Sequence, residues 1–136
     1  MKKRVYVEAE IPDPDRVEKA IREDDDATSL VELVVDVTMC SPDARWAESV
    51  CLRLASHQVV DVRVIAIYGL SHIARRFGEL GTPGSVDAVE AAMADESPAV
   101  REIAFETADD IERFTEMRVE RVLPDPRGPV PPPASG

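Results

Sequence analysis

The chain carries an internal repeat of 38 residues, which constrains its fold more than any other feature of the sequence. Shifted by that period, residues 62–73 align without a gap on residues 100–111. Both stretches begin Val-Arg, continue with Ile-Ala and end in isoleucine. Apolar residues of 50–55 align in the same way on those of 88–93. A period near forty residues, built from two antiparallel helices, is typical of an α-solenoid. The sequence therefore predicts an all-α fold, a short α-solenoid of about two and a half to three helix pairs.

Prolines, glycines and capping residues divide the chain into six predicted helices. Ser41 and Ser97 each precede a proline, and a hydroxyl before a proline in the first helical turn is a common helix start. The glycine-rich stretch 78–84 ends one helix, and Ser85 is the predicted cap of the next. The range 60–77 is apolar around most of its circumference, so we expect neighbouring helices to cover it on several sides. The predicted helices are 14–24, 28–40, 43–57, 60–77, 85–95 and 98–115.

The two ends of the chain differ in composition from its middle. Residues 1–12 have no helical period, and we predict an N-terminal arm. Residues 13–116 form the predicted helical domain. Residues 117–136 are predicted to be a disordered tail, because they hold six of the eleven prolines and proline lacks the N–H that regular structure needs.

The charge balance disfavours several classes of partner. The sequence has 27 acidic and 16 basic residues, a formal net charge of −11. An excess of this sign repels nucleic-acid phosphates and anionic lipids, so we expect neither nucleic acid nor a membrane as a partner, and a basic protein is favoured. Glu8 and Glu10 break the apolar run after the basic start, and no window is apolar for long enough to cross a bilayer. We therefore expect a cytoplasmic protein.

Residues that commonly carry catalysis or bind metals are sparse in this sequence. Cys40 and Cys51 lie in apolar helical patterns, and without a CxxC motif they are predicted to be reduced core thiols. His72 has no obvious serine or cysteine nucleophile paired with it. We therefore predict no catalytic residue, no cofactor and no metal site.

Several segments of the chain resemble HEAT repeats. Residues 61–63 (Asp-Val-Arg) and 99–101 (Ala-Val-Arg), each opening the second helix of a pair, look like HEAT-repeat sequences. Residues 46–52 (Trp-Ala-Glu-Ser-Val-Cys-Leu), His57 and residues 69–80 (Gly-Leu-Ser-His-Ile-Ala-Arg-Arg-Phe-Gly-Glu-Leu) resemble a group of small bacterial HEAT-like proteins. Some members of this group resemble immunity proteins of contact-dependent inhibition systems, which bind and neutralise a toxin domain. The resemblance covers about a quarter of the chain.

This resemblance implies a non-catalytic protein–protein interaction module and, more specifically, an immunity protein that neutralises a basic toxin domain through an acidic helical ridge. HEAT-like modules also occur in bilin lyases, so a bilin-lyase-like accessory enzyme or chaperone subunit is the alternative. A HEAT-like di-iron hydroxylase needs repeated His-Glu dipeptides, and here Gln58 and Ile73 follow the two histidines. A DNA-binding HEAT protein needs a basic groove, which the net charge disfavours.

The second helix of each pair is predicted to present a ridge of exposed side chains to the partner. Glu102, Glu106 and Asp110 stand at four-residue steps, where each like-charge pair costs the helix about 0.2–0.5 kcal/mol. A cationic partner turns this repulsion into attraction, and a merely solvated face is the alternative. His72 is predicted to be either a structural or an interface residue. The predicted partner-binding residues are Glu32, Asp36, Tyr68, His72, Arg75, Glu102, Glu106, Asp109 and Asp110.

Three other large side chains are predicted to be structural. Trp46 lies on a buried stripe, while Arg63 and Arg101 occupy equivalent places in the repeat and are expected to join consecutive repeats through carbonyl groups or acids. For the whole chain we expect a monomer or a weak homodimer.

Overall fold

The computed structural model describes residues 11–121 and 124–128, and over these residues it contains six α-helices and no strand. The predicted all-α class is confirmed, and each helix overlaps the range predicted for it. None of the helices in the described part of the chain has the length and apolar character that crossing a membrane requires. The helices are α1 (Pro14–Arg22), α2 (Ala27–Cys40), α3 (Ala44–Leu54), α4 (Val60–Phe77), α5 (Pro83–Ala92) and α6 (Pro98–Phe114).

Side-chain caps explain where three of the helices begin. The carboxylates of Asp13, Asp26 and Asp43 accept hydrogen bonds from backbone N–H groups at the starts of α1, α2 and α3. The prediction that Ser41 caps the third helix is wrong, because Ser41 is the C-cap of α2 and α3 begins three residues further on, after its cap Asp43. Ser85 likewise lies inside α5, whose first residue is a proline that fixes the helical φ.

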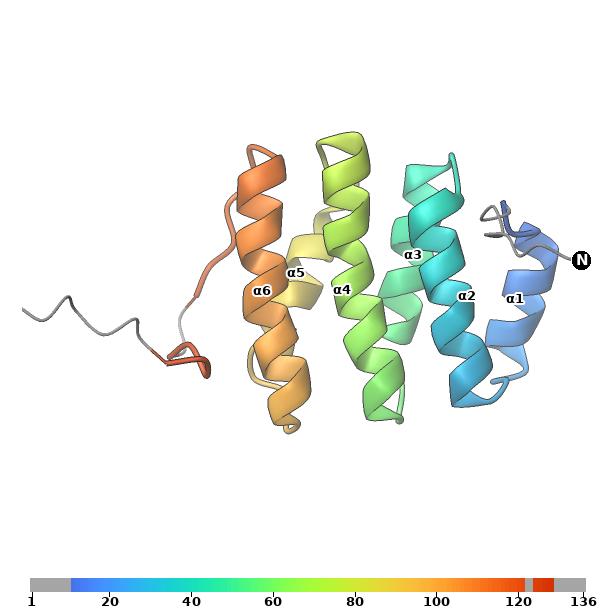
Figure 1. Cartoon of the computed structure of the whole chain (residues 1–136), viewed down its shortest axis with the longest axis horizontal. Helices are drawn as coiled ribbons and strands as arrows, with labels where there is room; N and C mark the ends of the chain where they lie inside the picture. The colour runs from blue at the N-terminus through green and yellow to red at the C-terminus, as the bar shows by residue number, and fades with distance from the viewer. Residues whose placement is uncertain (1–10, 122–123, 129–136) are drawn as a thin grey trace, which may run out of the picture.

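The helices stand side by side in two rows (Figure 1). α2, α4 and α6 form the row that faces the viewer, α3 and α5 stand behind them, and α1 lies beside α2 at one end. α4 contacts α2, α3, α5 and α6, so the prediction that this helix is covered on several sides is confirmed. Its residues Val62, Ala66, Leu70 and Ile73 are fully buried. The core therefore runs along the stack of helices, with α4 at its centre.

The sequence repeat recurs as a repeated set of hydrogen bonds. Arg63 Nη1 donates to the carbonyl oxygens of residues 57–58 at 2.9 and 3.1 Å. Arg101 Nη1 donates to the carbonyl oxygens of residues 95–96 at 2.7 and 3.1 Å. Arg63 also binds the carboxylate of Asp95 through Nε and Nη2, at 3.0 and 3.1 Å. The predicted contact between consecutive repeats is therefore confirmed for Arg63, which reaches Asp95 of the next helix pair. For Arg101 it is wrong among the described residues, because the carbonyls that Arg101 binds belong to the loop of its own helix pair.

The segment that directly follows α6 packs against the helices. It includes residues 119–120, which lie within the predicted tail 117–136. Val119 is buried, and its N–H donates to the carboxylate of Glu112 at 2.9 Å. The N–H of Glu120 donates to Glu90 of α5 at 2.7 Å. These residues precede the prolines, so their backbone N–H groups remain free to bond. The rest of the predicted tail at 122–123 and 129–136, and residues 1–10 of the predicted arm, lie outside the described residues.

One carboxylate holds α1 against α3. Glu18 accepts a hydrogen bond from the indole Nε1 of Trp46 at 2.9 Å and two from Arg53 at 2.6 and 2.8 Å. The hydrogen bonds from Arg53 and then Trp46 lower the pKa of Glu18 from 4.5 to about 2. The Trp46 ring packs against the core, and its N–H points outward to the Glu18 carboxylate. This arrangement is common for a ring that is apolar except for one donor.

Acidification is expected to loosen α1. Because the pKa of Glu18 is lower in the folded chain, its stabilising effect is complete above pH 4.5 and is lost as the pH falls through about 2. Trp46 is the single tryptophan, so its emission should shift over this interval while the α1 amides lose protection against hydrogen exchange, relative to the intrinsic exchange rate at each pH. A Glu18→Gln variant should show the altered emission already at pH 7 and little further shift on acidification. A full acid response in that variant would contradict the prediction.

Candidate partner-binding surface

α2, α4 and α6, the helices of the row that faces the viewer in Figure 1, each carry three solvent-accessible side chains along one side. On each helix the three residues are four positions apart, so they lie on successive turns of one side. This row of residues is apolar on α2, mixed on α4 and acidic on α6. We call the nine residues the front face: Val31, Val35 and Met39 of α2, Val64, Tyr68 and His72 of α4, and Glu102, Glu106 and Asp110 of α6.

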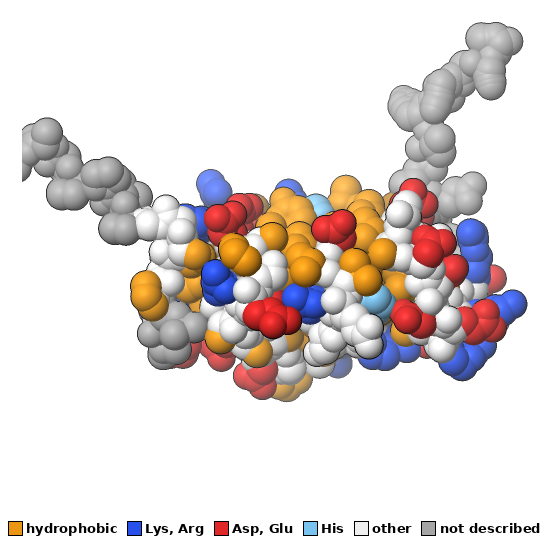
Figure 2. Space-filling model, turned by 90° about the horizontal axis from the view of Figure 1, so that it is seen from below, with side chains coloured by type: hydrophobic (Ala, Val, Ile, Leu, Met, Phe, Trp, Pro, Cys, Tyr) orange, Lys and Arg blue, Asp and Glu red, His pale blue; other side chains and the backbone are white. Residues whose placement is uncertain are grey.

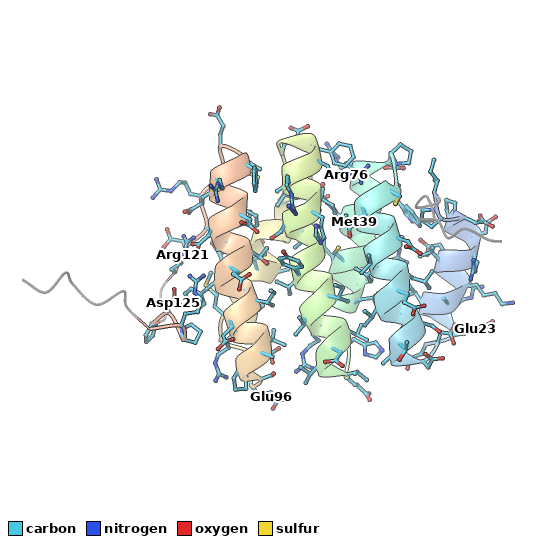
Figure 3. All side chains as sticks on the ribbon, viewed as in Figure 1. Glu23, Met39, Arg76, Glu96, Arg121 and Asp125 are labelled. Carbon is cyan, nitrogen blue, oxygen red and sulfur yellow. The ribbon has the colours of Figure 1, made fainter. Side chains whose placement is uncertain are left out.

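Two open hollows, whose exposed lining is mainly apolar, lie between the α2 and α4 parts of the front face, and we call them together the groove. One hollow of about 420 Å³ has Val31 and Val64 in its lining. A second hollow, of about 430 Å³, has Met39 (Figure 3) and Tyr68 in its lining. Seen from below, hydrophobic side chains gather along this side of the molecule (Figure 2). Val35 is 37% exposed and Met39 is 49% exposed, so this part of the front face offers apolar area to solvent.

An aromatic and cationic cluster closes one end of the groove. The rings of Tyr68 and His72 meet edge to face, with centroids 4.8 Å apart. Arg75 Nη2 lies 3.0 Å from His72 Nδ1, and since a guanidinium only donates, Nδ1 is the acceptor. Burial, and then the Arg75 guanidinium, lower the pKa of His72, while Asp110 acts in the opposite direction. The His72 ring is therefore uncharged near neutral pH. Arg75 also lies 5.8 Å from the ring centroid of Phe114.

Three carboxylates stand on successive turns along one side of α6. Within residues 11–121 and 124–128, no basic side chain lies at ion-pair distance from Glu102, Glu106 or Asp110. Glu102 and Glu106 are exposed and Asp110 is half-buried. Other acids are held by arginines of the same chain, namely Glu18, Asp95, Asp109, Glu112 and Asp125. The row is therefore a concentration of negative charge that faces solvent.

Two of the predicted partner-binding residues lie away from the front face. Asp109 is paired with Arg121 (Nη2–Oδ1 2.9 Å) and Arg127 (Nη2–Oδ2 3.2 Å) of the segment beside α6, where Figure 3 labels Arg121. Asp36 lines a hollow of about 390 Å³ between α1 and α2, and Glu32 borders both that hollow and the groove. Both Asp36 and Asp109 adjoin a front-face residue in sequence, and one residue turns a side chain about 100° around a helix. The other six predicted residues lie on α4 and α6: Tyr68, His72, Arg75, Glu102, Glu106 and Asp110.

The sequence prediction misses the α2 residues of the front face. Val31, Val35 and Met39 are apolar, and an apolar residue in a helical pattern predicts burial rather than a binding surface. The signal that could identify them is the width of the pattern, because α2 is apolar at more positions than one buried side of a helix can hold. Val35 and Met39 are the apolar residues of α2 that remain exposed after its buried side has packed.

Neither thiol belongs to the front face. Cys51 is fully buried, and burial followed by the nearby Glu48 raises the pKa of its thiol. Cys40 is half-buried, and burial followed by Asp36 raises its pKa in the same direction. In the described ranges, no three or more His, Cys, Asp or Glu side chains are grouped so that they could hold a metal ion.

Comparisons of the chain with protein-family models, with curated proteins and with solved structures found no match. The function of the front face is therefore inferred from its own geometry and charge.

Proposed function

We propose that this chain is a short HEAT-like α-solenoid of about two and a half to three helix pairs. The 38-residue repeat supports this proposal, as do the two-row order of the helices and the equivalent carbonyl contacts of Arg63 and Arg101. We further propose that it acts in the cytoplasm, as a monomer or a weak homodimer.

On this scaffold we propose a non-catalytic binding module whose partner is a basic protein. The observation that carries the proposal is the acidic row Glu102, Glu106 and Asp110, which places three carboxylates on successive turns of one side of α6 with no ion-pair partner among the described residues. Like charges one turn apart cost a helix about 0.2–0.5 kcal/mol per pair, and a cationic partner removes this cost. The net charge of −11 also attracts a basic partner and speeds encounter.

The more specific form of the proposal is an immunity protein that neutralises a basic toxin domain. It is supported by the resemblance of residues 46–52, His57, residues 62–63 and residues 69–80 to small bacterial HEAT-like proteins. A binder of this kind blocks its partner by occupying a surface, so it needs charge and shape complementarity and no catalytic group.

Charge reversal on α6 is expected to abolish most of the binding. The wild-type chain, Glu106→Lys and Asp87→Lys are each immobilised and exposed to cytosol from the source cell, and retained proteins are quantified by mass spectrometry. Asp87 is exposed on α5, in the other row, so its variant changes the net charge equally without touching the front face. We expect a basic protein to be retained by the wild type and by Asp87→Lys, and retained about tenfold less by Glu106→Lys.

Salt provides the second arm of this test. Raising the ionic strength from about 0.05 M to 0.5 M should release the same protein, because exposed charges are screened over a shorter distance. Equal retention by Glu106→Lys and Asp87→Lys, or retention that salt does not change, would refute the acidic row as the binding site.

A further inference from the structure

Building on the proposed function, we propose that the front face binds one amphipathic α-helix of the basic partner. The apolar stripe of that helix packs into the groove between α2 and α4, against Val35, Met39 and Tyr68. One flank of the helix carries Lys or Arg side chains, which reach the acidic row of α6.

The dimensions of the groove match a single helix. Helices packed side by side stand about 8–10 Å apart, so the α2 and α4 parts of the front face are one helix diameter from each other. Three residues at four-residue steps span about 12 Å along a helix axis, which corresponds to two turns of a bound helix. A helix lying along this groove presents one flank toward α6, so long Lys and Arg side chains on that flank extend across α4 toward the acidic row.

The front face changes from apolar on α2 to acidic on α6, and this change predicts where the apolar and basic residues of the bound helix lie. Val35 and Met39 expose apolar area beside the groove, and such area on a soluble chain is typical of an interaction site. Tyr68 on α4 adds an amphipathic ring of the type that dominates binding hot spots. Among the nine front-face residues the acids lie on α6, whereas Glu32 and Asp61 border only one end of the groove, so we place the basic residues of the partner on the flank of its apolar stripe that faces α6.

Charge complementarity also favours a foreign partner over a second copy of this chain. Two copies would each bring a net charge of −11 to the contact. Arg75 and Arg76 line one end of the groove, but the nine front-face residues themselves include three carboxylates and no Lys or Arg, so two copies would bring like charges together. A basic helix instead neutralises the row that carries the proposed function.

Three labelled peptides of about 18 residues, long enough to span α4, test the proposal by fluorescence anisotropy. The first is a helix with a leucine stripe at i, i+3, i+4 and i+7 and lysines along one flank. The second has the same composition with the order shuffled, so that its charge is unchanged and its stripe is lost. The third keeps the stripe and replaces the lysines by glutamates. We expect the first to bind about tenfold more tightly than the second, and the third not to bind.

Variants assign that difference to the groove. Val35→Thr and Met39→Gln keep the size of each side chain and add polarity, and the double variant should weaken the striped peptide about tenfold while leaving the shuffled one unchanged. Val59→Ser is the matched control, because Val59 is exposed at the N-cap of α4, outside the groove. Glu106→Lys should weaken both lysine peptides.

Each remaining outcome overturns a defined part of the proposal. If the striped and shuffled peptides bind equally, and only Glu106→Lys weakens them, the helix site is wrong and the proposed basic-partner function stands. If Glu106→Lys changes neither, the proposed function fails as well. A dimer seen by analytical ultracentrifugation, and dissolved by the Val35→Thr, Met39→Gln double variant, would overturn the helix site in favour of a second copy.

Discussion

Replacing Glu48 by alanine is expected to lower the free energy of unfolding by about 3–5 kcal/mol. Glu48 is fully buried on α3. Its carboxylate accepts hydrogen bonds from the N–H groups of Gly81 at 2.8 Å and Thr82 at 2.9 Å, and from the hydroxyl of Ser85 at 2.7 Å. Alanine leaves these donors without their acceptor inside the molecule, and each orphaned buried donor costs about 1–3 kcal/mol.

The position of these donors explains why the effect is large. They surround the first turn of α5, where the N-cap residue Thr82 makes no side-chain capping bond of its own. Glu48 therefore supplies from α3 the acceptor that a helix usually receives from its own N-cap. Its carboxylate also faces the positive end of the α5 dipole. Loss of this side chain should consequently weaken the start of α5 as well as the global fold.

Glu48→Gln is the matched variant for this prediction. The amide keeps the shape but turns one acceptor oxygen into a donor, so at least one of the backbone N–H groups of Gly81 and Thr82 loses its partner. We expect a loss of about 1.5–3 kcal/mol, smaller than that of the alanine variant. Urea unfolding followed by circular dichroism measures both losses, and hydrogen exchange should show faster opening at α5. An alanine variant within about 1 kcal/mol of the wild type would contradict the role assigned to this carboxylate.

The helices and their order could be predicted from sequence because their signals are local. The 38-residue repeat and the apolar spacing predict all six helices, and the aspartates before the early helices act as caps within three residues. Glu48 could not be predicted, because its donors lie 33–37 residues further along the chain. From sequence alone, a glutamate beside an apolar stripe predicts a side chain that is exposed to solvent. In the folded chain the start of α5 covers Glu48.

Part of the candidate surface could likewise be predicted from local sequence, and part of it depends on contacts that are distant in sequence. The acidic row on α6 follows from spacing alone, since Glu102, Glu106 and Asp110 share one side of a single helix. Asp109 differs, because the arginines that hold it come from residues 121 and 127, beyond the last helix. The exposed apolar residues of α2 also depend on packing, because only the final arrangement of helices decides which part of a wide apolar pattern stays uncovered.

Replacing Arg63 by methionine is expected to cost about 2–4 kcal/mol of unfolding free energy, whereas the same change at Arg101 should cost about 1 kcal/mol. Both arginines bind two backbone carbonyls at equivalent places in the repeat. Of these two arginines, only Arg63 also binds a carboxylate among the described residues, that of Asp95. The two side chains of this pair are 10% and 17% exposed. Methionine keeps the long stem and the helix propensity, so the comparison isolates the lost polar contacts.

A double-mutant cycle with Asp95→Asn tests where the difference arises. Burial alone would raise the pKa of Asp95, but hydrogen bonds from Arg63 and from the N–H of Ser97 outweigh it and lower that pKa. We therefore expect a coupling of about 1–3 kcal/mol between Arg63→Met and Asp95→Asn at pH 7, and a much smaller one with Arg101→Met. Equal costs for the two arginine variants would mean that the ion pair contributes nothing. Because Arg63 lies at the start of α4 and Asp95 just before α6, the coupling measures how firmly one repeat fixes the next. The spacing between the α4 and α6 parts of the front face depends on that connection.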